Sequence, residues 1–378
     1  MIRAGHQRQV QVRFALAAGV MLTVSFAWVL STAVASAQSA ASPAAIATSP
    51  IPVLAYYYIW YTPGSWDRAK SDLPSLGAYS SDDVTVMRQH IEWAKQAGIS
   101  GFIVSWKNTY TLSRRLDQLV EVARSENFKL AIEYEGLDFD RSPLPISQVA
   151  SDLDYFTAHW GADPVFSIFD KPLVIWSGTW EFSAAEIQSV TASRRDKLLI
   201  LASERNVADY QRLATMVDGD AYYWSSVNPT TFAGYDDKLN AMSSAVHANQ
   251  GLWIAPAAPG FDGRMIGGTT IVPRNNGQTL TAEYNAAASS NPDAIGLISW
   301  NEFSEASYIE PSKAYGQTYL TEVSDLLHAS VPPVTNFDSD ASSGGNRSLV
   351  HSLSQLMVFG TLIFTAAATV VVRAIRRM

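Results

Sequence analysis

Two glutamates three positions apart, Glu302 and Glu305, follow a short apolar run near the end of the chain. Cleavage of a glycosidic bond needs one group that protonates the leaving oxygen and a second that supplies a base or a nucleophile. Two carboxylates in one pocket suit this division because each disfavours ionisation of the other. The pair predicts a hydrolytic site. Acids close to a helix N-terminus, where the helix dipole favours them, are the alternative explanation of this spacing.

A second acidic pair, Glu133 and Glu135, lies two positions apart in an apolar segment. Side chains at this spacing on a strand point to the same face. Two acids inside a barrel are costly unless they serve a site or are paired. We interpret Glu135 as the functional member. The alternative role for Glu133 is one half of a buried ion pair. Histidines are few and cysteine is absent, so the site is expected to need no metal or organic cofactor.

The elements that must position these acids alternate between strand and helix from residue 51 to about residue 330. Eight apolar runs are predicted as strands, at 53–61, 101–106, 129–135, 172–177, 197–203, 221–225, 252–257 and 294–300. Eight strand–helix units in this length predict a (β/α)8 TIM barrel, a single domain over residues 53–330. A doubly wound open sheet is the alternative, but the turn after the first strand lacks its glycine-rich phosphate motif.

In a barrel of this kind the active site lies at the carboxyl ends of the strands. Those ends are rich in aromatic and acidic residues here. Aromatic faces suit the C–H faces of sugar rings, while carboxylates and amides bind hydroxyls. The residues predicted to bind substrate are Asn301, Glu135, Trp106, Tyr58, Tyr61, Trp224 and Asp262. Packing in the core is the alternative role for the aromatic members.

Charge disfavours a nucleic-acid partner. The 378-residue chain carries a formal net charge of -8, and six of its arginines lie in the terminal segments. Without those six, 21 basic residues face 35 acidic ones, a net charge of about -14. A surface this acidic repels phosphate backbones. The expected partners are a polysaccharide or glycan substrate and, through a C-terminal helix, a membrane.

Both ends of the chain carry membrane signals. Residues 1–37 combine a basic start, an apolar run and Ala35-Ser36-Ala37, the pattern of a secretory signal peptide, with an uncleaved anchor as the alternative. Residues 349–372 are predicted as a transmembrane helix, and linkers at 38–52 and 331–348 flank the barrel. The arginine-rich tail at 373–378 is expected in the cytoplasm. We therefore expect a single-pass protein of the cell membrane with an extracellular barrel.

The order of several segments resembles glycoside hydrolase families 99 and 71. These segments are 56–61, 99–106, 129–135, Pro259-Gly260-Phe261-Asp262, and Trp300-Asn301-Glu302-Phe303-Ser304-Glu305 with Ile309-Glu310-Pro311. The resemblance runs over most of residues 51–320, and the last motif is its most specific part. It implies a barrel glycosidase that acts on α-linked glycans.

The resemblance to family 99 further implies a retaining, endo-acting α-mannosidase. It implies that Glu302 deprotonates the sugar 2-hydroxyl, giving a 1,2-anhydro intermediate, while Glu305 is the general acid and then the base. Asn301 would hold the carboxylates or substrate, and Glu135 would contact the sugar.

The family motif usually continues Glu-Trp-His-Glu-Gly-Thr-Gln, where this chain has Phe303, Ser304, Ala306, Ser307 and Tyr308. An α-glucanase-like activity, as in family 71, therefore stays open. So do a glycan-binding barrel without catalysis and a transglycosidase that remodels surface polysaccharide.

Overall fold

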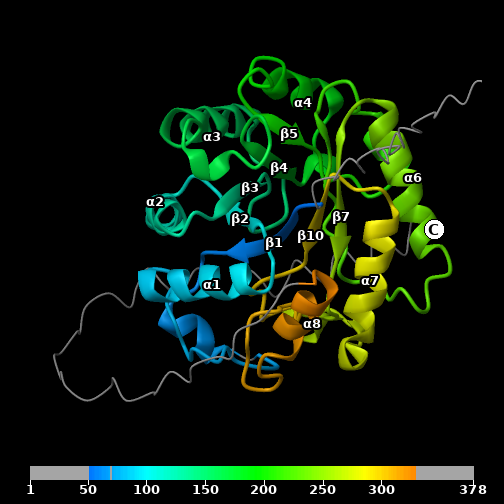
Figure 1. Ribbon diagram of the computed structural model, residues 1–378. Coiled ribbons are helices and arrows are strands. Elements are labelled where there is room, and N and C mark those ends of the chain that lie inside the picture. Colours follow the sequence, from blue (N-terminus) through cyan, green and yellow to red (C-terminus); the bar gives the residue numbers. More distant parts are fainter. Residues whose placement is uncertain (1–50, 69, 329–378) are drawn as a thin grey trace, which may run out of the picture. The chain divides into compact units, whose positions relative to one another are not determined.

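The computed structural model describes residues 51–68 and 70–328. Its main sheet has eight parallel strands in the order β5-β4-β3-β2-β1-β10-β7-β6. Its two ends meet at a bridge between Ala202 and Asp220, where Ala202 N–H donates to the carbonyl of Gly219 (3.0 Å) and Ala221 N–H donates to the carbonyl of Ala202 (2.9 Å). The sheet closes into a (β/α)8 barrel, which confirms the predicted fold class (Figure 1).

The barrel strands are β1 (Val53–Tyr58), β2 (Gly101–Trp106), β3 (Lys129–Glu135), β4 (Leu173–Ser177), β5 (Leu199–Leu201), β6 (Gly219–Asp220), β7 (Leu252–Ala257) and β10 (Ala294–Leu297). The helices around them are α1 (Val84–Gln96), α2 (Tyr110–Ser125), α3 (Ile146–His159), α4 (Ala184–Thr191), α5 (Val207–Gln211), α6 (Tyr235–Ala248), α7 (Gln278–Ser289) and α8 (Thr318–Leu326). A small antiparallel ribbon, β8 (Phe261–Asp262) with β9 (Ile271–Val272), follows β7.

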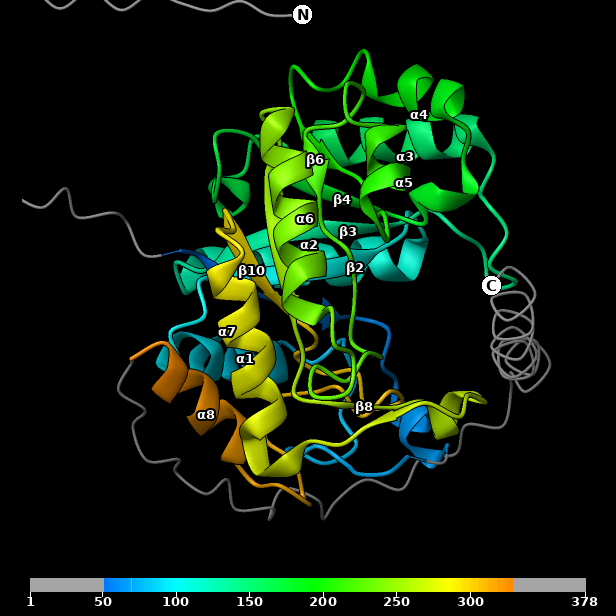
Figure 2. The same cartoon turned by 90° about the vertical axis from the view of Figure 1, so that its right-hand side faces the viewer.

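Side chains that alternate along the strands form two separate cores. On β1, Leu54, Tyr56 and Tyr58 belong to the inner core of the barrel, which they share with residues such as Ile103 and Ile175. The neighbouring positions of each strand face the surrounding helices and form a larger outer core. In Figure 2, α6 and α7 run along the outside of the barrel, and both helices contact β7. Each strand is therefore buried on both faces, as expected for a parallel barrel.

β1, β5 and β10 are each at least three residues shorter than predicted, and β5 covers only Leu199–Leu201 of the predicted 197–203. β1 ends at Tyr58, whose backbone N–H and carbonyl bond to the side-chain amide of Asn301. β10 ends at Leu297, because the chain from Ser299 onward folds back on itself. β6 comprises only Gly219 and Asp220, so the prediction of a strand at 221–225 is wrong. That aromatic segment lies just beyond the strand, at the mouth of the barrel.

The predicted signal segment at 1–37, the linker at 331–348, the membrane helix at 349–372 and the tail at 373–378 lie outside the described residues. Within 51–68 and 70–328, every helix is too short or too polar to cross a bilayer.

Candidate active site

The loop after β10 carries both glutamates of the acidic pair and closes on itself. Ser299 N–H donates to the carbonyl of Ser307 (2.7 Å), and Ile309 N–H donates to the carbonyl of Ser299 (2.9 Å). Inside this loop, Glu302 N–H donates to Ser299 Oγ (2.7 Å). Glu302 is buried and Glu305 is partly exposed. The loop thus holds the two carboxylates at the carboxyl end of the barrel at different depths.

A buried arginine fixes the second half of this loop. Arg274 Nη2 donates to the carbonyls of Ala306 (2.9 Å) and Tyr308 (2.8 Å). Its guanidinium lies 4.2–4.9 Å from the ring centres of Tyr308, Tyr315 and Tyr319. Ala306 has φ of 51°, a left-handed conformation that costs an L-residue about 1–2 kcal/mol. Arg274 therefore stabilises a strained turn directly after Glu305.

Burial raises the pKa of both glutamates, but their surroundings differ. The negative charge of Glu302 adds to burial at Glu305 and raises the pKa of Glu305 to about 8. At Glu302 the rise in pKa caused by burial is opposed by Ser304 N–H, which donates to Glu302 Oε1 (2.8 Å), and by the charge of Lys70. The surroundings therefore favour the proton on Glu305 over Glu302.

The two glutamates of β3 point into the same part of the barrel. Ser105 Oγ donates to Glu135 (2.7 Å). Burial and the charge of Glu135 raise the pKa of Glu133 well above its ordinary value, and the charge of Glu305 adds to this rise. One oxygen of Glu133 is buried without a hydrogen-bond partner among the described residues. The charges of carboxyl groups from β3 and the β10 loop thus act on one another, and Glu135, Glu302 and Glu305 are the members of this group that the sequence singled out.

Two tyrosines line the space between these carboxyl groups. Burial raises the pKa of Tyr58, and so do the negative charges of Glu133, Glu302 and Glu305. The pKa of Tyr223 is likewise raised by burial and by the same three negative charges. Its hydroxyl is buried, and hydrogen bonding from Tyr223 opposes the rise in the pKa of Glu305. Both phenols therefore stay protonated and lie close enough to the acids to bind a hydroxyl placed among them.

Asn301 is fully buried and holds the site together. Its Oδ1 accepts from Tyr58 N–H (2.8 Å), and its Nδ2 donates to the carbonyl of Tyr58 (3.0 Å) and to Tyr79 Oη (3.3 Å). Tyr61 Oη donates to the carbonyl of Asn301 (2.6 Å) and its ring stacks on Trp66. Asn301 and Tyr61 were predicted to bind substrate. In the structure their hydrogen bonds instead connect β1 and the segment after it to the β10 loop.

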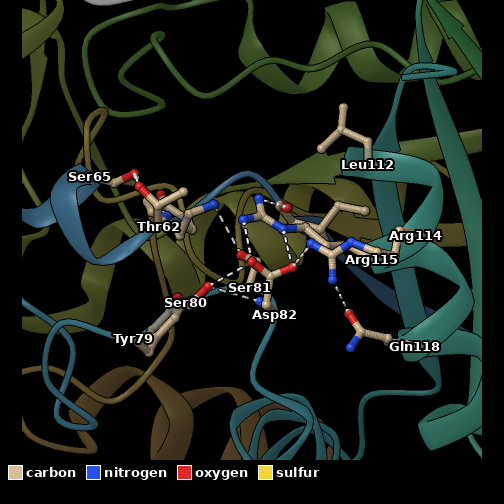
Figure 3. A network of polar contacts seen from close by, with 12 residues as sticks. Thr62, Ser65, Tyr79, Ser80, Ser81, Asp82, Leu112, Arg114, Arg115 and Gln118 are labelled. Atoms are coloured by element: carbon tan, nitrogen blue, oxygen red, sulfur yellow. Dashed lines mark hydrogen bonds and ion pairs between the residues drawn. The ribbon is translucent and has the colours of Figure 1, made fainter. Parts of the chain in front are cut away.

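An ion-pair network anchors the segment after β1 (Figure 3). Arg115 is buried and makes two hydrogen bonds to Asp82, each 2.9 Å long. Its Nη1 also donates to the carbonyl of Ile59 (2.9 Å). This network fixes the chain that follows Tyr58 against α2, and so it limits movement of that side of the site.

Two predicted site residues face away from the barrel interior. Trp106 is fully buried in the outer core, where it packs near Tyr134 and Trp160. Trp224 also belongs to the outer core and stacks on Tyr235 with ring centres 4.7 Å apart. Their chain neighbours Ser105 and Tyr223 take the inward positions, because successive side chains of an extended chain alternate between faces.

Asp262 lies beside the site through its backbone. Its N–H donates to the carbonyl of Glu305 (2.8 Å). Its carboxylate pairs with Arg264 (2.5 Å), and this bond lowers the pKa of Asp262. The Asp262 carboxylate, which was predicted to bind substrate, is therefore bound to Arg264 in the structure.

Four residues of the site were not predicted: Tyr223, Lys70, Arg141 and Arg274. Tyr223 could have been found from alternation along its segment. The others come from loops without a periodic pattern. Arg141, in the loop after β3, is exposed, and its charge opposes the rise in the pKa of Glu133 and Glu305. Across 51–68 and 70–328, no group of three or more His, Asp or Glu side chains is arranged to hold a metal ion.

Comparison with known proteins assigns the chain to a family. The family model of glycosyl hydrolase family 99 matches residues 62–321, more than half of the chain. A glycoprotein endo-alpha-1,2-mannosidase of Rattus norvegicus is 24% identical over 279 residues, covering 67% of this chain and 60% of that protein. The Mus musculus protein of the same name is 25% identical over 282 residues, with the same coverage. This chain thus spans about 60% of the length of these relatives.

Solved structures agree on the fold. The GH99 endo-alpha-mannosidase from Bacteroides thetaiotaomicron has a TM-score of 0.63 at 22% identity, covering 74% of this chain and 98% of that one. A structure described as a glycoside hydrolase-like protein has a TM-score of 0.57 at 17% identity, covering 76% and 96%. The extent of the family match, on a barrel that brings its acidic motif together, shows that the chain belongs to glycosyl hydrolase family 99.

Proposed function

We propose that the protein is a retaining glycoside hydrolase that cleaves α-linked polysaccharide or glycan within the chain, with α-mannosides as the first candidate substrate. The proposal depends above all on the convergence of Glu302 and Glu305 from one closed loop, with a pKa of about 8 for Glu305. A carboxyl group that is still protonated near neutral pH is suited to protonating a leaving oxygen. The names of the relatives supply the substrate class.

The unequal surroundings of the two glutamates support different roles. Glu305 would give its proton to the leaving glycosidic oxygen and would then act as the base towards water. Glu302, whose negative charge Lys70 and Ser304 N–H favour, would take the proton of the sugar 2-hydroxyl as that oxygen attacks the anomeric carbon. Tyr58, Tyr223 and Glu135 would bind the hydroxyls of the reacting sugar.

The departure from the family motif at Phe303 lies in the core. Phe303 is fully buried and stacks on Tyr308 with ring centres 4.0 Å apart. Trp66 contacts it from another side. This substitution therefore changes packing beneath the loop and gives no reason to exclude α-mannosides. Ser304 is partly buried, and its Oγ is 3.4 Å from Lys70 Nζ.

The test is product release from a panel of α-mannans and α-glucans. The wild-type protein should release oligosaccharides from at least one polymer, and Glu302→Gln and Glu305→Gln should each reduce the rate at least a hundredfold. Glu181→Gln, at an exposed position, is the matched control and should keep the wild-type rate. Binding without release by the wild-type protein would instead support a glycan-binding barrel. Products extended by added acceptor sugars would support a transglycosidase.

We also propose that the chain ends place the barrel on the outer face of the cell membrane. The apolar stretches at 1–37 and 349–372 and the terminal arginines support this location. In cell fractionation, the full chain should resist alkaline washing of membranes, and a chain that ends at residue 338 should be released into the medium. Release of the full chain by the same washing would contradict membrane anchoring.

A further inference from the structure

Two cations lie on aromatic rings near the mouth of the barrel, beside the carboxyl ends of β5 and β6. The guanidinium of Arg205 lies 4.4 Å from the ring centre of Trp180. The ammonium of Lys238, on α6, lies 4.2 Å from the ring centre of Trp224 and 5.4 Å from that of Tyr222. The three rings come from the segments after β4 and β6, and Arg205 comes from the segment after β5, so three strand ends contribute to this cluster.

Neither positive charge forms a direct ion pair within residues 51–68 and 70–328. Nearby Arg212 pairs with Glu204 at 3.0 Å, and the charge of Arg205 also opposes the rise in the pKa of Glu204. Lys238 is partly buried. Burial lowers the pKa of Lys238, and the charge of Arg205 lowers it further. Two like charges side by side are unfavourable. Their position is notable in a chain whose body carries about -14.

The cluster adjoins the proposed catalytic site. The ring of Tyr222 lies under the ammonium of Lys238, and the positive charge of Arg205 opposes the rise in the pKa of Tyr222. The next residue, Tyr223, lies among Glu133, Glu302 and Glu305. Trp180 and Tyr222 pack against the outer core, whereas Tyr223 packs against the inner core of the barrel. A glycan that continues from the carboxylates over this rim would meet the two cations.

Rings and cations together match one kind of ligand. A ring face can pack against the C–H face of a sugar. An arginine or lysine beside it forms a charge-assisted hydrogen bond with a carboxylate or phosphate oxygen. We propose that Arg205 and Lys238, with Trp180 and Tyr222, form a subsite for an acidic sugar, so that the substrate is an anionic α-linked glycan. This inference rests on the proposed function and names its substrate class.

Binding should be measured on the full chain carrying Glu302→Gln, so that no substrate is consumed. The probes are a neutral α-mannan, a phosphate-substituted α-mannan and polygalacturonate, and the last two separate phosphate from carboxylate recognition. We expect at least one anionic polymer to bind about tenfold more tightly than the neutral mannan at low salt, with the difference shrinking as salt is added.

The double variant R205Q/K238Q should reduce this preference to within about twofold. K197Q/K313Q removes two exposed positive charges elsewhere and should leave the preference intact. Because Lys238 packs on Trp224, K238R serves as a second variant that keeps the charge and should retain the preference. Thermal unfolding of each variant checks that it is folded.

The proposal would be overturned by equal binding of neutral and anionic polymers, or by an equal loss of preference in K197Q/K313Q. Failure of the catalytic proposal would look different. In that case the wild-type chain would release no product from any polymer, while the binding measurements would still report on the subsite.

Discussion

Replacing Glu305 with glutamine should stabilise the protein at alkaline pH and leave its stability almost unchanged near pH 4. The folded protein raises the pKa of Glu305 from 4.5 to about 8. Between these values the folded state holds a proton that the unfolded state has lost. Stability therefore falls as the pH rises through this window, and the loss is complete above the folded pKa. Glutamine resembles the protonated acid and does not ionise.

The magnitude follows from the size of the shift. A shift of one pKa unit corresponds to 1.36 kcal/mol, so an isolated group with this shift would lose about 5 kcal/mol. Glu305 is partly exposed and shares the site with Glu302, which reduces the cost. We expect Glu305→Gln to be more stable than the wild type by about 2 kcal/mol at pH 9. This is an increase of roughly 4–8 °C in Tm.

The assay is denaturant and thermal unfolding of the wild type, Glu305→Gln and the surface control Glu181→Gln, each from pH 4 to pH 9. The difference in the free energy of unfolding between Glu305→Gln and the wild type should grow between pH 5 and pH 8. Glu181→Gln should have the wild-type stability at every pH. Parallel curves for the wild type and Glu305→Gln across this range would refute the reasoning, because they would mean that Glu305 ionises as freely as it does in the unfolded chain.

Three further predictions concern the elements around the acidic loop. Ala306→Gly should raise stability by about 0.5–1 kcal/mol, because φ of 51° suits glycine; no gain on thermal unfolding would argue against strain there. Arg274→Met should lower the stability by about 3 kcal/mol, since two carbonyls lose a charged donor. It should lower kcat more than it changes KM, and Arg274→Lys should recover part of the lost stability and part of the lost kcat. Full activity in Arg274→Met would contradict a positioning role for Arg274. Trp106→Leu should destabilise the outer core by about 2–4 kcal/mol without changing KM for glycans; an increase in KM at unchanged stability would place Trp106 in the site instead.

Much of the fold could be predicted because it depends on local periodicity. β2, β3 and β7 have the predicted bounds, since each is a short apolar run between polar turns. The strand ends were less predictable. β1 stops where Asn301, more than 240 residues further along the chain, replaces a strand partner, and no local pattern encodes such a contact.

For this protein, the sequence alone determined the acidic motif, the alternation of strands and helices, and the shared face of Glu133 and Glu135, because spacing fixes each of these locally. Which face of each strand lies inside the barrel depends on how the strands and helices pack in three dimensions. On β2 both faces are apolar and buried, so alternation separates Ser105 from Trp106 without showing which one reaches the site. The roles of Lys70 and Arg274 were likewise decided in three dimensions, since each approaches the β10 loop from a distant segment.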